Sequence, residues 1–467
     1  MKKIFSNLKK ATALTLAAAL LIPCLSGCGE KTGKKNDDRI TISVSNAPKE
    51  ENNPERYKQF MEQIARFEEK YPNIHVVGDE WAFDLQTFAA KAEGGTLPTI
   101  YYIPFTQTKN LMRLGYAVDI TKQINDYGYY DIISDYTMEN ISHDGKIYYM
   151  PRDLYTMNLT VNMNLFREAG LVDENDTPKI PNTYDELLET AKIIKEKTGK
   201  AGFMMPATGV GGWEFTVFAW AFGTQFMEEN DGKYTATFDS PECIEALQFI
   251  KDMKWKYDVL PDNIFINIEE QMKLMATDQC AMCISNYDAT QNMAGNFGMK
   301  ADDIGVGNLP AGPKRRVTLV GGSYASFAPN ATQEQLDAAF KYLTFENDVL
   351  NFDDAAKKTM EDKVKLDIEL GYIVGLKGLS IWNNNSEYQK YADELQEKLC
   401  NVNPNHIKAY NDQSGIEFQT EEPVCASNLN DTLAACIQEV LTDKDADCAA
   451  ILKQANSDFQ KNYLDYE

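Results

Sequence analysis

Residues 39–45 read RITISVS, an apolar–polar alternation that is typical of a strand with one buried face. Further strands are predicted at residues 74–77 and, after a Leu-Pro pair, at residues 100–103. Between the first two, apolar side chains recur at offsets of three and four and predict a helix: Tyr57, Phe60, Met61, Ile64 and Phe67. Strands that alternate with helices in this way predict an α/β fold with parallel sheets.

Several helix starts are marked farther along the chain. The segments from Thr183 to Glu186 and from Thr332 to Gln335 have the pattern of a capping box, in which two side chains bond the first free backbone N–H groups. Ser240 precedes a proline, which the first helical turn tolerates. The stretch from about residue 334 to the end is predicted to be mostly helical.

Length and charge limit the classes of function. The chain has 467 residues, which at roughly 100–200 residues per domain predicts about two to four domains. Its 43% hydrophobic and 25% charged residues are ordinary for a globular protein. Acidic residues outnumber basic ones by 70 to 46, so the surface repels phosphate backbones and anionic lipid headgroups. This charge argues against nucleic-acid binding.

The first 27 residues have a basic start and then an apolar run from Ala11 to Ile22, shorter than the roughly 20 apolar residues that span a bilayer. The run leads to Leu25-Ser-Gly-Cys28, which resembles the lipobox of a bacterial lipoprotein; the alternative is an ordinary cleaved signal with a chance cysteine. We therefore predict a lipoprotein signal peptide at residues 1–27 and an extracytoplasmic protein anchored to the cell membrane only by a lipid on Cys28. Residues 28–38 are predicted to be a flexible tether.

Seven cysteines follow Cys28, and an odd number cannot all pair within one chain. Cys280 and Cys283 have the spacing of a redox or zinc half-site. They lie in QCAMCISN (residues 279–286), which is predicted to be a buried strand, and side chains three apart on a strand point to opposite faces. We therefore interpret the cysteines as core thiols.

Motifs for catalysis or cofactor binding are missing. The histidines His75, His143 and His406 lie far apart and lack the spacing of metal ligands. The sequence has neither a Gly-x-Ser-x-Gly elbow nor a phosphate-binding Gly-x-x-x-x-Gly-Lys-Ser/Thr loop, and its glycine clusters at 209–212 and 321–322 are typical of turns. Among 70 acidic residues many carboxylate pairs arise by chance, so a glycosidase pair stays open. We predict no catalytic residue, cofactor or metal.

A series of local patterns extends over nearly all of the chain after residue 38. The most specific is DGKIYYMP (144–151) followed by LTVNMNLFREAG (159–170); the others are FEEKYPNI (67–74), LPTIYY (97–102), GYAVDIT (115–121), PNTYDEL (181–187), AM (281–282), IGVGNLP (304–310) and GG (321–322). Their order resembles the family 1 extracellular solute-binding proteins, the sugar-binding components of ABC importers. Two departures are Met163, where the family usually has lysine, and Tyr287, where it often has tryptophan.

The resemblance implies the type II periplasmic-binding-protein fold, in which strands cross between two α/β lobes that enclose a ligand cleft. The first lobe would comprise residues 39–153 and 288–334, and the second residues 154–287 and 335–467 with the C-terminal helices. The crossings would lie at residues 153–157 and 285–288. Cleft closure would follow from a ligand that contacts both lobes at once.

The resemblance also implies where a sugar would bind. Such a site needs flat apolar faces for the sugar ring and fixed polar groups for its hydroxyls. Residues at strand ends, loops and crossings are the candidates: Asn46, Trp81, Gln107, Tyr155, Trp213 on a loop before a helix at 215–222, Tyr287, Asp288 and Ser323. For each of them the alternative is core packing or plain surface exposure. Trp220 is predicted to be a core residue, and Trp382 has no assigned role.

From these features we expect a monomeric lipoprotein that captures a mono- or oligosaccharide and delivers it to the permease subunits of an ABC importer. A non-sugar solute is the first alternative, which a cleft dominated by charged groups would favour. The second is a surface glycoside hydrolase, which requires two carboxylates about 5–10 Å apart across the sugar. The sequence does not name the sugar, its linkage or the permease.

Overall fold

The computed structural model describes residues 39–466 except for positions 53 and 348. The predictions for the signal peptide, the tether and the lipid on Cys28 lie outside these residues. In the part of the chain that is described, no helix is both long and apolar enough to cross a membrane.

The first part of the chain forms the strands and helices that its periodicity predicts. Strand β1 (Ile40–Val44) pairs in parallel with β2 (Ile74–Gly78) and, at its end, with β3 (Ile100–Pro104). Helix α1 (Pro54–Lys70) connects the first two strands and buries Ile64 and Phe67. The ring of Phe67 packs edge-on against Tyr342 of helix α12 (Gln333–Asn347) at a centroid distance of 5.2 Å.

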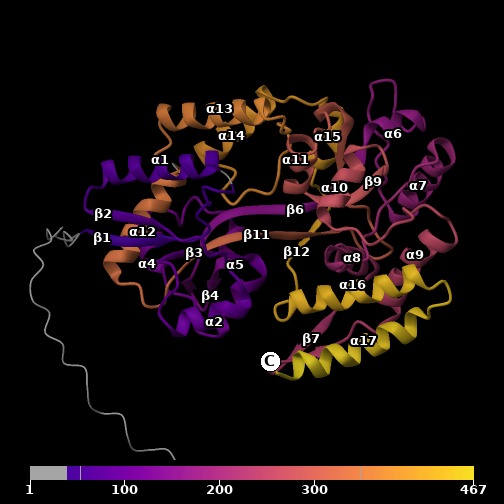
Figure 1. Cartoon of the computed structure of the whole chain (residues 1–467), viewed down its shortest axis with the longest axis horizontal. Helices are drawn as coiled ribbons and strands as arrows, with labels where there is room; N and C mark the ends of the chain where they lie inside the picture. The colour runs from indigo at the N-terminus through magenta and orange to yellow at the C-terminus, as the bar shows by residue number, and fades with distance from the viewer. Residues whose placement is uncertain (1–38, 53, 348, 467) are drawn as a thin grey trace, which may run out of the picture. The chain divides into compact units, whose positions relative to one another are not determined.

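Two long antiparallel strands connect the two halves of the molecule. Strands β6 (Met150–Asn162) and β11 (Val317–Phe327) run side by side between the group of β1, β2 and β3 and the group of α8, β9 and α10 (Figure 1). Strand β11 pairs with β3 at one end, while β6 pairs beyond Thr156 with β9 (Met282–Asn286) and β10 (Ile304–Gly307). The sheet is therefore mixed rather than parallel, because β6 and β11 return between the halves without a crossover helix.

The remaining elements surround this frame. In chain order they are α2 (Leu85–Glu93), η1 (Phe105–Gln107), α3 (Thr108–Arg113), α4 (Thr121–Tyr127), α5 (Asp135–Ile141), β4 (Ser142–His143), β5 (Lys146–Ile147), α6 (Met163–Glu168), α7 (Tyr184–Thr198), α8 (Gly209–Phe222), β7 (Met227–Asn230), β8 (Lys233–Ala236), α9 (Pro241–Trp255), α10 (Ile268–Ala276), α11 (Tyr287–Gly295), η2 (Ala301–Asp303), α13 (Asp354–Glu369), α14 (Glu387–Lys398), α15 (Pro404–Asn411), β12 (Glu417–Gln419), α16 (Ala426–Thr442), α17 (Cys448–Asn462) and η3 (Leu464–Tyr466). The prediction of a mostly helical C-terminal stretch is confirmed.

The predicted helix starts can be compared with the observed caps. At α12, the Thr332 N–H donates to Gln335 Oε1 (3.0 Å) and the Gln335 N–H donates to Thr332 Oγ1 (3.2 Å), so the capping box is complete. Ser240 caps α9, which begins at the proline. At α7, Thr183 accepts from the Glu186 N–H, but the Glu186 carboxylate accepts from the preceding Asn182 N–H, so only half of the predicted box forms.

Buried apolar side chains divide into clusters that follow the two halves. The first cluster draws on residues 42–150 and 320–349, together with Trp382. The second cluster draws on residues 157–319 and 424–464. Strands β6 and β11 pass from one cluster to the other, because each contributes buried residues to both.

A third cluster lies beside the second and includes residues from 201–306 and 373–410. Buried residues between 288 and 319 therefore pack in the second and third clusters, whereas those between 336 and 349 pack in the first. The expected lobe boundaries at 287/288 and 334/335 stay a prediction.

Two of the buried cysteines, Cys280 and Cys283, do not point to opposite faces as expected. Cys280 and Cys283 are both buried in the third cluster, so the prediction that they face opposite sides is wrong. The reason is that β9 begins only at Met282, so strand alternation does not apply to Cys280. Burial raises the pKa of the Cys280 thiol to about 12, which keeps it protonated. Five of the seven described cysteines are buried, while Cys400 and Cys425 are partly exposed.

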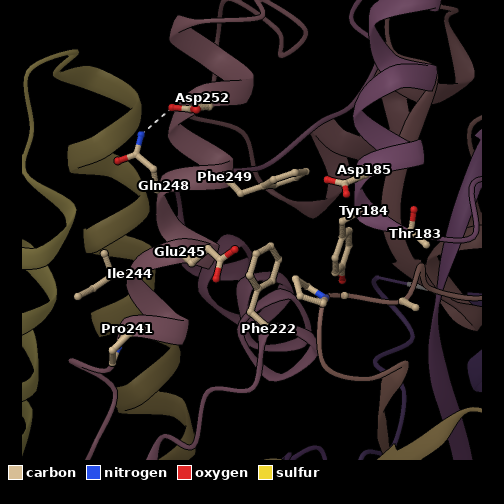
Figure 2. A pocket seen from close by; sticks show the side chains of 13 residues that line it. Thr183, Tyr184, Asp185, Phe222, Pro241, Ile244, Glu245, Gln248, Phe249 and Asp252 are labelled. Atoms are coloured by element: carbon tan, nitrogen blue, oxygen red, sulfur yellow. Dashed lines mark hydrogen bonds between the residues drawn. The ribbon is translucent and has the colours of Figure 1, made fainter.

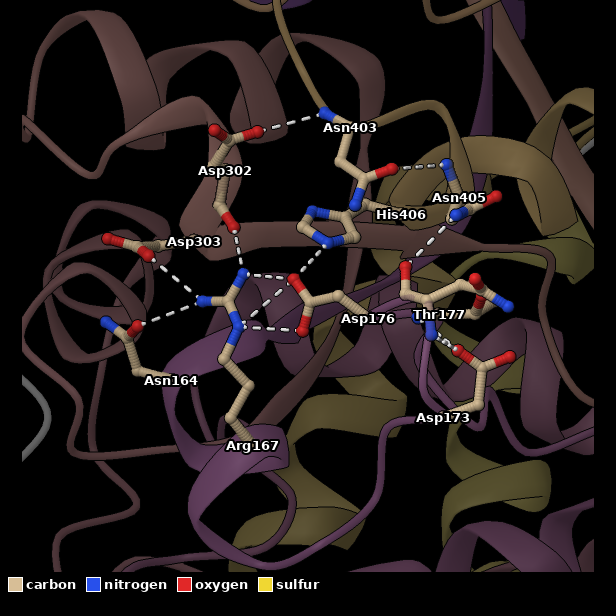
Figure 3. Close-up of polar contacts among 11 residues, drawn as sticks. Asn164, Arg167, Asp173, Asp176, Thr177, Asp302, Asp303, Asn403, Asn405 and His406 are labelled. Carbon is tan, nitrogen blue, oxygen red and sulfur yellow. Dashed lines mark hydrogen bonds and ion pairs between the residues drawn. The ribbon is translucent and has the colours of Figure 1, made fainter.

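A polar network holds α15 against the loop that follows α6 (Figure 3). Asp176 Oδ2 accepts from Arg167 Nη2 at 2.7 Å and lies 2.9 Å from Nε2 of the buried His406. Arg167 Nη1 also donates to Asp303 at 3.3 Å. The bonds from Arg167, and then the bond from His406, lower the pKa of Asp176 to about 2.

This pairing predicts a pH-dependent loss of stability in the variant Asp176→Asn. The pKa of Asp176 is about 2 in the folded protein and near 3.8 in the unfolded protein. A carboxyl with a lowered pKa stabilises the fold at pH values above its unfolded pKa. This contribution is lost as the pH falls toward the folded pKa. Because the side chain is about one-third exposed, we discount for solvent screening and expect a loss of about 1 kcal/mol at pH 6 and about half of it at pH 3. Urea unfolding at the two pH values measures the difference, and Glu174→Gln in the same loop is the control. A difference that does not change with pH would contradict an electrostatic role.

Candidate ligand-binding site

The centre of the candidate site is the place where β6 and β11 run together. Tyr155 lies opposite Gly321 in the antiparallel register. A Cβ atom on Gly321 would lie 2.4 Å from the Tyr155 ring, so only a glycine lets the ring lie over this strand. At Gly322 the backbone φ is +153°, and a Cβ atom would lie 2.2 Å from the Asp153 carbonyl oxygen. The glycine pair is therefore inside a strand, and the interpretation of it as a turn is wrong because the close approach of β6 requires it.

Trp213 comes to this point from a helix and not from the loop that was predicted. Helix α8 already begins at Gly209, so Trp213 lies in its second turn. A Cβ atom on Gly212 would lie 1.8 Å from the Asn430 carbonyl oxygen, which shows that the glycine allows α16 to lie directly against α8. The glycines at 209–212 thus lie in the helix rather than in a turn, and Gly212 serves helix packing.

Tyr155 and Trp213 form an aromatic pair. Their ring centroids are 6.4 Å apart with an interplanar angle of 72°, an edge-to-face arrangement. Both side chains are partly exposed, unlike the fully buried Trp220 of the same helix. The pair therefore presents apolar ring surface where the strands connect the two halves.

Carboxylates and a hydroxyl group lie around this pair. The Ser323 hydroxyl donates to Asp153 Oδ2 at 2.6 Å. Asp288, in the first turn of α11, is exposed, and desolvation, followed by the charge of Asp153, raises its pKa. Burial raises the pKa of Tyr155, and the negative charges of Glu421, Asp288 and Asp153 raise it further. Three carboxylates from separate segments therefore act on one phenol.

Two of the surrounding charges have partners of their own. Glu421 Oε1 accepts from Asn430 Nδ2 at 2.8 Å, while burial raises the pKa of its carboxyl. The Arg152 guanidinium lies over the Tyr102 ring at 4.0 Å, and its Nε is 3.8 Å from Asp153 Oδ2. The cation beside the site is thus held between a ring face and a carboxylate.

Two of the other predicted residues lie at the end of the first sheet. The Asn46 N–H donates to the Trp81 carbonyl at 3.0 Å, which joins the segments after β1 and β2. The Trp81 ring contacts Phe83 and Tyr101, and its Nε1 donates to Thr87 Oγ1 at 3.2 Å. This indole packs against the first cluster, just as Trp213 packs against the second, and both are partly exposed.

Gln107 and Tyr287 lie apart from the aromatic pair; Gln107 is buried, whereas Tyr287 is partly exposed. Gln107 ends η1, shortly after Pro104, which pairs with Ser323 across β3 and β11. Tyr287 packs against the third cluster, and burial raises the pKa of its phenol. Of the eight predicted residues, the structure brings together four: Tyr155, Trp213, Asp288 and Ser323.

Three residues of this group were not predicted as ligand contacts. Asp153 and Arg152 lie at the start of the predicted crossing, where their charge was the available signal. Glu421 is distant in sequence from every other member, and no local pattern connects it with them. Trp220 is fully buried, as predicted, and Trp382 stacks on Tyr129 at 6.0 Å within the first cluster, so it is a core residue.

A pocket of about 760 Å³ lies elsewhere, between α7 and α9 (Figure 2). Tyr184, Phe222 and Phe249 form its apolar side, and acidic groups such as Glu245 and Asp252 lie around it. Its lining comes from α7, the end of α8, α9 and residues 311–313, all within the second half. It therefore does not connect the two halves.

The described residues also limit metal chemistry. Between residues 39 and 466, apart from positions 53 and 348, no three His, Cys, Asp or Glu side chains gather as a metal ion would require. The aromatic pair, the carboxylates and the hydroxyl group are thus the chemistry that the strand crossing offers.

The sequence model of the bacterial extracellular solute-binding proteins matches residues 51–345, and the chain belongs to this family. This confirms the family that the local patterns resemble.

Individual relatives agree with this assignment. The chain is 25% identical over 266 residues to the polygalacturonan/rhamnogalacturonan-binding protein YtcQ of Bacillus subtilis (strain 168), which covers 54% of this chain and 52% of that protein. It is 26% identical over 204 residues to the maltodextrin-binding protein MdxE of the same organism, with 42% and 43% covered. The chain thus spans about half the length of the curated relatives it matches.

The fold is shown by solved structures. Maltose-bound MalE3 of T. maritima superposes with a TM-score of 0.66 at 18% identity, covering 91% of this chain and all (100%) of that chain. The two-lobe α/β fold of the periplasmic binding proteins is therefore confirmed.

Proposed function

We propose that this protein binds a mono- or oligosaccharide at the crossing of β6 and β11 and delivers it, as a monomer, to the permease subunits of an ABC importer. The single observation that carries the proposal is the partly exposed pair of Tyr155 and Trp213 beside Asp153, Asp288 and Ser323. The names of the relatives YtcQ and MdxE support a carbohydrate ligand.

The chemistry of the group fits a sugar. The C–H faces of a pyranose ring are apolar and pack on aromatic rings, which lose little conformational entropy on binding. Sugar hydroxyls donate hydrogen bonds, and ionised carboxylates such as Asp153 accept them more strongly than neutral groups do. We therefore assign Tyr155 and Trp213 to stacking, and Asp153, Asp288 and Ser323 to the hydroxyls.

The arrangement of the buried clusters supports a moving cleft. We propose that the first lobe includes residues 320–349, whose buried side chains pack in the first cluster. Residues 157–319 belong to the second lobe, because their buried side chains pack in the second cluster and in the third cluster beside it. Trp213 and Asp288 then lie on the second lobe and Ser323 on the first. A ligand that contacts both lobes would shift the population toward a closed form.

A ligand screen tests the proposal. Neutral mono-, di- and trisaccharides of glucose, xylose, mannose and galactose are added to the purified protein, and thermal unfolding is followed. A sugar present at 100 times its dissociation constant stabilises the folded state by about 2.7 kcal/mol. We expect at least one sugar to do so and to bind with one-to-one stoichiometry in calorimetry. A complete absence of sugar binding would refute the proposal.

A second candidate is the same scaffold with a cationic, non-sugar solute. The three carboxylates near Tyr155 favour it, because a cation would be attracted to them. The same screen therefore includes spermidine and basic amino acids. Stabilisation by one of these and by none of the sugars would establish this candidate.

We also propose that the protein binds its ligand without altering it. Prolonged incubation with the sugar that binds best should return that sugar intact in chromatography. Release of shorter sugars that stops when Asp153 or Asp288 is replaced would establish the glycoside hydrolase alternative instead.

The lipid anchor is a further part of the proposal and rests on the residues that precede Cys28. We expect the wild-type protein to partition with membranes. The variant Cys28→Ser should be released from them or remain an unprocessed precursor, because it lacks the sulfur atom that carries the lipid. Fractionation of cells and metabolic labelling with a fatty acid measure both. A wild-type protein that is wholly soluble and unlabelled would contradict the anchor.

A further inference from the structure

We infer that the pocket of about 760 Å³ between α7 and α9 is a second ligand-binding site, and that its ligand is a small organic cation with a flat apolar body, such as an arylalkylammonium. The size of the pocket, its aromatic side and the sign of its charged groups support this assignment. The pocket lies within the second half of the molecule and includes no residue of β6 or β11. The inference therefore does not rest on the proposed sugar site.

The size and the apolar side of the pocket are those of a small-molecule site. Its volume falls within the roughly 300–1,000 Å³ that is typical of ligand pockets. The ring centroids of Tyr184, Phe222 and Phe249 lie 5.9–6.1 Å from one another, so they form one aromatic group (Figure 2). Phe249 is partly exposed, whereas the other two rings are almost fully buried. A flat apolar ligand would therefore contact Phe249 most.

The charged side chains that line the pocket are all negative. Asp185 comes from the first turn of α7, and Glu245 and Asp252 come from α9. Among the described residues that line the pocket there is no lysine, arginine or histidine. In Figure 2 the rings of Tyr184 and Phe222 are drawn between Asp185 and Glu245. An apolar surface and negative charges from two helices thus face one space.

Two of these three carboxylates have no partner in the protein. Asp252 Oδ1 accepts from Gln248 Nε2 at 2.6 Å, and its Oδ2 lies 3.9 Å from Lys256 Nζ. In the part of the chain that the structure describes, no hydrogen bond or ion pair joins the side chain of Asp185 or Glu245 to another residue. Both side chains are exposed, so water solvates them in the empty pocket.

This imbalance sets the charge of the ligand. A ligand that covers Asp185 or Glu245 removes water from a carboxylate, which is costly unless a positive charge and N–H donors replace the water. An ammonium group provides both, and it is also attracted to the face of an aromatic ring. A neutral alcohol of the same shape provides one weaker donor, and a carboxylate adds repulsion.

The same residues argue against a metal ion as the ligand. A calcium ion needs six to eight oxygen ligands around it. Within the described residues, no three His, Cys, Asp or Glu side chains gather closely enough to hold a metal ion, so the pocket carboxylates do not form such a set. Separated carboxylates beside an aromatic group suit a cation that carries its own apolar body.

The experiment compares three ligands that share one ring system and differ in charge. These are 1-naphthylmethylammonium, 1-naphthalenemethanol and 1-naphthoate, and equilibrium dialysis against the purified full-length protein at pH 7 measures their binding. At 20 mM salt we expect the cation to bind at least fivefold more tightly than the alcohol, and the anion to bind most weakly. At 300 mM salt the advantage of the cation should shrink, because the Debye length shortens from about 20 Å to about 6 Å.

Variants locate the site. Glu245→Gln keeps the shape of the side chain and should weaken binding of the cation at least threefold without changing binding of the alcohol. Asp185→Asn is the second variant in case the first does not fold. Glu196→Gln removes one charge from the far end of α7, where Glu196 pairs with Lys197 outside the pocket, and it should leave binding of the cation unchanged.

The strand crossing also combines aromatic rings with carboxylates, so a variant there is needed. Trp213→Ala should leave binding of the naphthyl cation unchanged, because Trp213 does not line the pocket. Loss of cation binding in Trp213→Ala, with none in Glu245→Gln or Asp185→Asn, would place the cation at the crossing and overturn the inference. Equal binding of all three ligands, or binding of none, would overturn it as well. None of these results depends on whether the crossing binds a sugar.

Discussion

Replacing Gly212 with alanine is expected to destabilise the protein by about 3 kcal/mol or more, the upper range for overpacking in a core. The added Cβ atom would lie 1.8 Å from the Asn430 carbonyl oxygen and 2.8 Å from the Ala434 backbone nitrogen. Neither contact is with a flexible side chain, so the two helices α8 and α16 would have to separate. The urea concentration at the midpoint of unfolding measures the loss.

Gly209 provides the matched control in the same helix. A Cβ atom there would have Asp431 Oδ1 at 3.9 Å as its nearest contact, which is an ordinary distance. Gly209→Ala should therefore leave stability unchanged or raise it by up to about 1 kcal/mol, because alanine restricts the unfolded chain and favours a helix. Equal destabilisation by both substitutions would show that helix packing at Gly212 is not the cause.

Replacing Trp213 with alanine is expected to raise the dissociation constant of the bound sugar about thirtyfold, which corresponds to about 2 kcal/mol. The indole lies edge-to-face with Tyr155 and is partly exposed, so its loss removes stacking surface from the ligand and a neighbour from the tyrosine. Calorimetric titration of the folded variant measures the affinity, and its melting curve shows whether the fold is intact.

The control for Trp213 is Trp255 in α9. This indole is exposed, and its Nε1 donates to the Val440 carbonyl at 2.8 Å, so it stabilises the packing of α9 against α16. We expect Trp255→Ala to lower the melting temperature without a change in affinity. If Trp213→Ala behaves in the same way, Trp213 is a structural residue and leaves the proposed site.

Features that depend on neighbours in sequence could be predicted. The alternation at residues 39–45 and the apolar spacing at 57–67 correspond to β1 and α1, because strand and helix periods place side chains on one face independently of the rest of the fold. The cap at Thr332 is likewise local. Periodicity does not fix where an element begins. Strand β9 begins after Cys280, later than expected, and helix α8 begins at Gly209, earlier than expected.

Features that depend on contacts between distant segments could not be predicted. Glycines next to one another are typical of turns, and only the position of α16 shows that Gly212 serves a helix contact. In the same way, only the register of β6 and β11 places Tyr155 over Gly321. The influence of Glu421 on Tyr155 is of the same kind.

The sequence by itself determined the α/β class, the family and the aromatic and acidic residue types from which a site could be built. The tertiary structure decided which of them meet: Tyr155, Trp213, Asp288 and Ser323 lie together, whereas Trp81 lies beside Phe83 and Tyr101 at the end of the first sheet. The physical reason is that periodicity and capping act over a few residues, while the pairing of β6 with β11 and of α8 with α16 depends on surfaces that form only when the whole chain has folded.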